Sequence, residues 1–227
     1  MRQIILFWVF LGQIYASGWT LVGDTFTDKS GTCEFDIWLR LEKSENLGFY
    51  ADCVVFKGLS LQVANNASTH SFGDKAFFEI EQEFYTNKEE TFNFGMIFGD
   101  AFGTNENNGG VFKSNQPYFY IPIAWRFFNQ KLQTTINIGY STNFIQDFLI
   151  LSGSLNFNPI PWLNIISEIS TSSNHQGFAI TNASFWQIGA IFFIKDNISL
   201  DFAYLNDLDI STSGTFIFSI TFKSQIF

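Results

Sequence analysis

The stretch CEFDIWLRLE, from Cys33 to Glu42, decides how the chain folds. Its odd-numbered residues are apolar, and its even-numbered residues are charged except for Trp38. Since side chains alternate between the two faces of a β-strand, the stretch predicts a strand with one apolar and one charged face. In a soluble sheet the apolar face covers a core, whereas in a membrane barrel it contacts lipid and the charges line the interior. The rest of the sequence has to distinguish these two arrangements.

The same alternation recurs along the chain, and no helical period of 3.6 residues stands out. Most of the apolar faces are rich in Phe, in keeping with 30 Phe and an aromatic share of 19%. The stretch 182–194 is ambiguous, because it is apolar on both faces. We predict twelve strands, near 32–42, 48–56, 59–65, 75–85, 91–100, 117–128, 132–142, 147–157, 162–171, 182–194, 197–205 and 213–223.

The connections between these strands alternate in length. The even connections are tight and carry turn residues, as in KG, NQK and KDN, while the odd ones are longer and rich in Asn, Ser, Gly and Thr. Short turns at one end and long loops at the other are typical of outer-membrane barrels. A soluble, secreted β-sandwich that acts as a binding module remains the alternative, since it also alternates. The expected fold is an all-β, transmembrane, antiparallel up-and-down β-barrel of about twelve strands.

The N-terminus has the organisation of a secretory signal peptide. Arg2 gives a positive start, residues 4–11 form an apolar run too short to span a membrane, and small residues follow at 16–18. We expect a signal peptide over 1–18, an N-terminal periplasmic segment over 19–30 and an outer-membrane barrel over 31–227. A buried N-terminal strand or helix is the alternative for the first segment.

Several stretches resemble known outer-membrane proteins. The end of the chain, GTFIFSITFKSQIF, resembles the terminal strand that the barrel assembly machinery reads by its last aromatic residue, although Phe227 is out of phase with the apolar residues before it. TDKSGTCEFDIWLRLEK, GDKAFFEIEQEF and WQIGAIFFIKDNISLDFAYLNDL are similar to a family labelled as outer-membrane proteins of the phenol meta-pathway type. The matching residues are Gly31, Glu34, Gly73, Asp74, Gly189, Asp196, Asn197, Leu200, Asp201 and Tyr204. The resemblance implies a barrel of about twelve strands and a transport role, and it brings no catalytic residues.

If the apolar faces contact lipid, the polar faces fill the interior. Acids outnumber bases nine to two there, which predicts either a water-filled path that favours cations and polar solutes over anions, or a narrow interior braced by ion pairs to the two arginines. The predicted lumen-lining residues are Glu34, Asp36, Arg40, Glu42, Asp52, Glu79, Glu81, Glu83, Arg126, Glu168 and Asp201.

Other functions find little support in the sequence. The net charge of −9 disfavours a nucleic-acid partner. The two histidines, His70 and His175, lie in predicted loops without a nucleophilic triad or zinc spacing around them, so we expect no enzyme activity, no metal and no cofactor. The partners we expect are outer-membrane lipid, the barrel assembly machinery and a small solute. A structural or adhesive surface role for the long loops, chiefly 101–116 and 172–181, is the second hypothesis.

The two cysteines fall in neighbouring predicted strands. Both share the apolar parity, so both are expected on the lipid side. A hairpin turn near Glu45 would place Cys33 opposite about residue 57, so a disulfide with Cys53 would need a register shift. The sequence therefore favours two free apolar cysteines, with a disulfide as the alternative.

Overall fold

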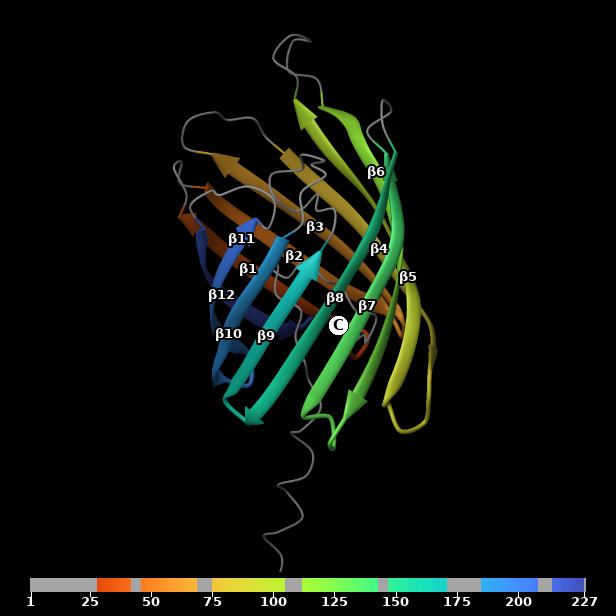
Figure 1. The fold of residues 1–227 in the computed structure, drawn as a ribbon, viewed down its shortest axis with the longest axis vertical. Helices are drawn as coiled ribbons and strands as arrows, with labels where there is room; N and C mark the ends of the chain where they lie inside the picture. The colour runs from red at the N-terminus through yellow and green to blue at the C-terminus, as the bar shows by residue number, and fades with distance from the viewer. Residues whose placement is uncertain are drawn as a thin grey trace, which may run out of the picture.

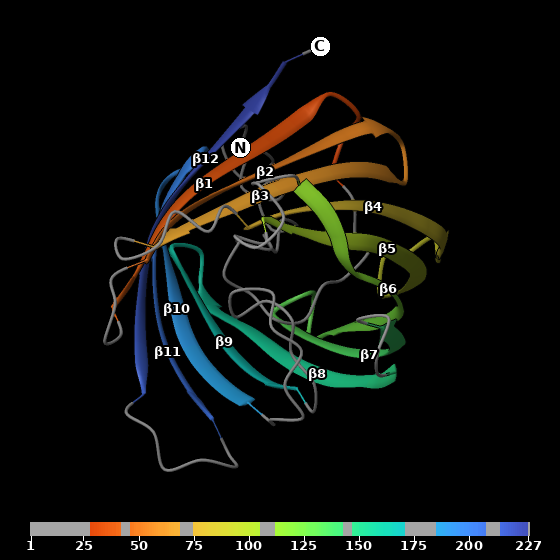
Figure 2. The same cartoon turned by 90° about the horizontal axis from the view of Figure 1, so that it is seen from above.

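Twelve antiparallel strands close into one barrel in the computed structural model of the chain (Figures 1 and 2). The structure describes residues 28–41, 46–68, 75–104, 112–142, 147–170, 185–207 and 214–226. Each strand pairs with its neighbours in sequence, and β1 pairs with β12 to complete the ring. The strands are β1 (Thr32–Leu41), β2 (Asn46–Phe56), β3 (Leu59–Ser68), β4 (Lys75–Thr86), β5 (Phe92–Thr104), β6 (Phe112–Phe127), β7 (Leu132–Thr142), β8 (Asp147–Ile160), β9 (Leu163–Ser170), β10 (Phe185–Lys195), β11 (Ile198–Asp207) and β12 (Thr215–Gln225).

The apolar faces of the strands point outward. In β1, Phe35 and Ile37 are 42% and 50% exposed, while Asp36 between them is 1% exposed. The same pattern repeats around the barrel, where Phe, Leu and Ile side chains form an exposed belt. A soluble sandwich would bury this face, whereas a transmembrane barrel presents it to hydrocarbon. The predicted fold class is therefore confirmed, and the sandwich prediction is wrong.

The strand connections also alternate as predicted. The even connections leave only 57–58, 87–91, 128–131, 161–162 and 196–197 between strands, and these tight turns gather at the lower end of the barrel in Figure 1. The strand ends that the odd connections join lie at the opposite end of the barrel. Large exposed aromatic side chains lie at or next to the tight turns, which is where outer-membrane barrels place an aromatic girdle: Phe56, Phe84, Tyr85, Phe128 and Trp162.

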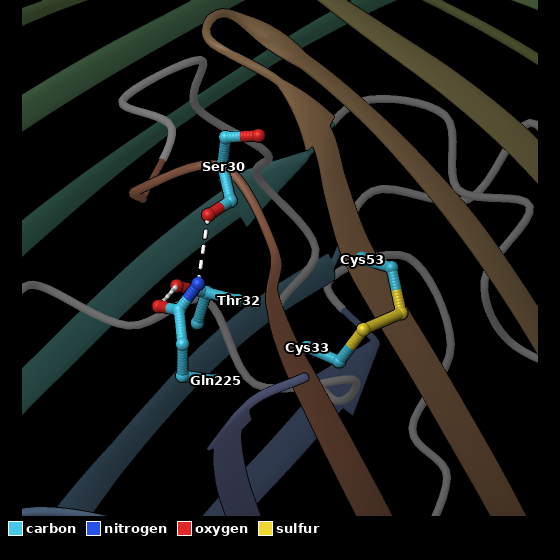
Figure 3. The surroundings of a disulfide bond; sticks show 5 residues. All are labelled: Ser30, Thr32, Cys33, Cys53 and Gln225. Carbon is cyan, nitrogen blue, oxygen red and sulfur yellow. Dashed lines mark hydrogen bonds between the residues drawn. A yellow bond between two sulfur atoms is a disulfide. The ribbon is translucent and has the colours of Figure 1, made fainter. Parts of the chain in front are cut away.

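The seam between β1 and β12 is paired along ten residues, from Thr32 opposite Gln225 to Leu41 opposite Phe216. At its lower end the chain before β1 is held as well. Gln225 Nε2 donates to the carbonyl of Ser30 at 2.8 Å (Figure 3). The Ile226 amide donates to the carbonyl of Gly31 at 2.8 Å. Phe227 lies outside the described residues, so its role in assembly stays a prediction.

Cys33 and Cys53 form a disulfide between β1 and β2, so the expectation of two free cysteines is wrong (Figure 3). The two residues are direct partners across the strands, and Arg40 pairs with Asn46. The hairpin is therefore centred near residue 43 rather than near Glu45. Moving a hairpin centre by two residues moves each partner by four, which brings residue 53 opposite Cys33 without changing the face on which either cysteine lies.

Three interior glycines lie directly opposite aromatic residues of a neighbouring strand. Gly48 faces Trp38, Gly99 faces Tyr118 and Gly139 faces Tyr120, and each pair is in direct register. A Cβ atom added at any of the three would overlap the neighbouring ring or backbone. At Gly48 and Gly99 the absence of a side chain makes room for the opposite aromatic ring, a known way of stabilising a glycine in a strand, whereas at Gly139 it lets the two backbones approach closely.

Removing the disulfide should lower stability. It closes a loop with a sequence separation of 20, for which chain entropy predicts a loss of about 3 kcal/mol in a C33A/C53A variant. Urea unfolding of the detergent-folded protein, followed by heat-modifiable gel migration, would measure the shift. An unfolding midpoint equal to that of the unaltered chain would contradict the stabilising role, as would two free thiols in a thiol titration of the folded protein.

Gly139→Ala should destabilise the barrel by about 1–3 kcal/mol, because the new methyl group would overlap the Phe119 carbonyl oxygen and Tyr120. Gly153→Ala, on the outer face of β8, is the control, since its nearest atom would be the Thr135 carbonyl oxygen at 3.6 Å, an ordinary contact. The same urea unfolding assay compares them. Equal midpoints for both variants would show that the close packing at Gly139 has no energetic consequence.

Candidate functional site: the barrel interior

The inner face of β1–β4 carries most of the acidic residues. Glu34, Asp52, Gln62 and Glu79 are consecutive partners across the four strands, so they form one row around the wall. We call this row, together with Asp36 and Glu81 beside it, the acidic wall. Glu34, Asp36, Glu79 and Glu81 are all buried, and Asp52 is half-buried. The alternation of side chains directs these residues inward, and the register of the strands aligns them although they come from different segments of the sequence.

Two interactions with neutral side chains support the acidic wall. The Tyr118 hydroxyl donates to Glu79 Oε1, and Gln62 Nε2 donates to Glu81 Oε2 at 3.0 Å. Among the described residues, Glu34 Oε1 and Asp52 Oδ1 are buried oxygens without a hydrogen-bond donor. Since these two carboxyl groups are direct cross-strand partners, their mutual repulsion has to be offset by a cation, a proton or water.

Lys223 on β12 is an interior cation that sequence reasoning missed. It is the direct partner of Glu34 across the seam, and its ammonium group forms an ion pair with Asp28, just before β1. The signal was available in its parity, because Lys223 alternates with the inward Ser219 and Thr221.

The remaining predicted residues are spread over other parts of the interior. Asp201 on β11 accepts hydrogen bonds from Ser199, Ser219 and Thr221, each at 2.9 Å, and Gln187 donates to Glu168 on β9 at 3.2 Å.

The two predicted arginines lie apart from each other. Arg126 Nε donates to Gln133 at 3.0 Å, and the Arg40 guanidinium lies 5.5 Å from the ring centre of Trp38. Glu83 is half-buried on β4, and Glu42 lies outside the described residues.

The interior has two further walls of different chemistry. β7–β9 present neutral amides and hydroxyls, which we call the amide wall: Gln133, Thr135, Asn137, Ser152, Ser154, Asn156 and Asn164. The second is an apolar cluster formed by β9–β12 together with Trp38 of β1. Its residues are Trp38, Ile166, Ile191, Ala203, Leu205 and Ile217. A second small cluster joins Ile97 and Ile150 to Tyr118 and Tyr120, whose rings stack at 6.2 Å. The acids are thus concentrated on one side of the interior.

This arrangement presents carboxylates, amides and hydroxyls, which attract cations and form hydrogen bonds. Within the described residues, no group of three or more His, Cys, Asp or Glu side chains could hold a metal ion. The same residues contain no α-helical segment with the length and hydropathy of a membrane span. His70 and His175 lie outside the described residues, so the expectation of no enzyme activity stays a prediction.

The fold and its outward apolar belt define the class: a twelve-stranded β-barrel of the outer-membrane type. Several solved structures of outer-membrane channels share this fold. The KdgM porin matches with a TM-score of 0.65 and 9% identity over 83% of this chain and 98% of the porin.

Two further channel structures match with comparable TM-scores and sequence identities. The NanC porin has a TM-score of 0.58 and 8% identity over 84% of this chain and 98% of the porin. The COG4313 outer membrane channel from Pseudomonas putida F1 has a TM-score of 0.58 and 8% identity over 89% of this chain and 98% of the channel. Neither a known protein family nor a curated protein sequence matches the chain. At these identities the likeness establishes the fold.

Tyr118→Phe should destabilise the barrel by about 1–3 kcal/mol, because the ring over Gly99 stays while buried Glu79 loses its hydroxyl donor. Tyr85→Phe, on the exposed outer surface next to a tight turn, removes a hydroxyl without this role and should leave stability unchanged. Urea unfolding at neutral pH compares them. Equal stability of the two variants would mean that the hydroxyl does not support Glu79.

Proposed function

We propose that this chain is a channel of the bacterial outer membrane that passes small solutes and prefers cations and uncharged polar solutes to anions. The fold that it shares with the KdgM and NanC porins and with the Pseudomonas putida channel supports the channel role. The acidic wall carries the proposed selectivity, because Glu34, Asp52 and Glu79 are aligned in register across the inner surface. Rings and rows of carboxylates favour cations in a pore.

The size of the solute follows from how closely the interior is filled. Side chains from every strand project inward, and most of them are buried. Small barrels leave little room inside once their inward side chains are placed. We therefore expect a low single-channel conductance and a small upper limit on the size of the solute. If no current passes, the alternative function is a structural or adhesive barrel that acts through its loops.

The finer assignments belong to the same proposal. The similarity of the first strand and of the β10–β11 hairpin to outer-membrane proteins of the phenol meta-pathway type supports membership of that transport family. Secretion by the N-terminal signal, contact of the outer belt with outer-membrane lipid and insertion by the barrel assembly machinery complete the proposed route. The oxidising periplasm is compatible with the Cys33–Cys53 disulfide.

The proposal is tested by reversal potentials across a planar bilayer in a salt gradient. The unaltered chain should be cation-selective, and Glu79→Gln combined with Asp52→Asn should lower its cation-to-anion permeability ratio several-fold, because two charges leave the acidic wall. A control with the same charge change is Glu89→Gln combined with Glu90→Gln, since both residues are exposed in the β4–β5 turn.

Two results would contradict the proposal. No current above background would remove the channel role. Equal permeability ratios for the wall and turn variants would remove the acidic wall as the origin of selectivity, while leaving conduction intact.

A further inference from the structure

The amide wall contains polar groups that the fold itself does not use. Among the described residues, both polar side-chain atoms of Asn164 and the Oδ1 atom of Asn156 lack a hydrogen-bond partner. Outside the amide wall, both polar side-chain atoms of Asn93 on β5 lack one as well. Asn93 and Asn164 are 0% exposed and Asn156 is 8% exposed. A buried amide without a partner costs about 1–3 kcal/mol, so such groups call for a role other than stability.

These amides belong to a continuous surface. Gln133 on β7 is the direct partner of Asn156 on β8, and one step further along the strands Thr135 is the direct partner of Ser154. Asn164 on β9 lies diagonally from Asn156, because Asn156 pairs with Ile166 two residues along. Neighbouring positions on this wall are therefore separated by the strand spacing of about 4.8 Å and by diagonals of about 7–8 Å.

The chemistry of the wall selects one class of ligand. An amide offers both a donor and an acceptor, and a hydroxyl does the same, so the surface matches a solute that carries many groups of that dual kind. The wall residues themselves carry no charge, and two of their cross-strand partners, Arg126 opposite Gln133 and Glu168 opposite Ser154, have opposite signs. A charged ligand gains little there, whereas a neutral polyhydroxylated solute can satisfy several amides at once.

We propose that the amide wall is a binding track for neutral saccharides, with Asn156 and Asn164 as its central contacts. The route by which a saccharide reaches the wall rests on the proposed channel function, because these side chains are buried and are contacted only when the interior opens to a solute. The track deepens that function by naming its substrate class. Saccharide recognition would lie on β7–β9, and ion selectivity on β1–β4.

The test measures binding and conduction separately. Isothermal titration of the detergent-folded chain with a neutral trisaccharide gives the equilibrium affinity, and block of the single-channel current by the same sugar reports binding inside the pore. Asn156→Leu combined with Asn164→Leu should weaken both by about tenfold or more, since each amide–hydroxyl bond contributes on the order of 1 kcal/mol. Leucine has nearly the shape of asparagine, and the lost amide atoms include three without a partner, so this variant should fold.

Matched controls isolate the amide chemistry. Ser167→Leu changes an exposed polar residue on the outer face of β9, the strand that carries Asn164, and should leave saccharide affinity unchanged. A fully O-methylated trisaccharide, which keeps the ring but has no hydroxyl donors, should bind at least tenfold more weakly to the unaltered chain. This second comparison needs no variant, so it remains decisive if the leucine variant fails to fold.

The outcomes separate the two proposals. Current without measurable trisaccharide binding would overturn the saccharide track and leave the channel standing. Amide-dependent binding without current would overturn the channel and leave the track standing. Equal affinity of the unaltered chain and the leucine variant, or equal affinity for the methylated sugar, would overturn the track, and the buried amides would then be structural groups satisfied by water.

Discussion

Closure of β1 onto β12 is the constraint on which the rest of this structure depends. In hydrocarbon an unpaired backbone N–H or C=O costs several kcal/mol, so a sheet can cross a membrane only when it has no edge. The seam from Thr32–Gln225 to Leu41–Phe216 removes the last edge, and the contacts of Ser30 and Gly31 with Gln225 and Ile226 extend it beyond the strands. The disulfide fixes β1 to its other neighbour, so this seam strand is held on both sides.

A closed ring of twelve strands forces half of the side chains into a confined interior. This confinement explains why the rings of Trp38 and Tyr118 lie over Gly48 and Gly99, since a ring fits against the wall there only because the opposite residue has no side chain. It also explains why carboxyl groups from β1, β2 and β4 become neighbours. Like charges packed on one wall repel one another, and the negative potential that they produce together is the physical origin of the proposed preference for cations.

The strands and their inward and outward faces could be predicted from the sequence, because each strand carries its own two-residue period. Phe35 and Asp36 show the rule in its clearest form. This two-residue period was ambiguous at β10, because Ile191 and Phe193 belong to an apolar cluster inside the barrel and both faces of the strand are therefore apolar. It failed to predict the pairing of Cys33 with Cys53, because register depends on where the hairpin is centred, and a shift of two residues there leaves the parity pattern unchanged.

The sequence by itself determined an all-β chain of twelve strands, tight turns at one end and an apolar outer face, because these properties are local and repeat along the chain. Only the tertiary structure decided which interior groups meet. Glu34 and Asp52 become direct partners, Lys223 joins Glu34 across the seam, and Gln133, Asn156 and Asn164 form a neutral wall on a different part of the ring. The physical reason is that closure and register, which no single strand encodes, place distant segments side by side.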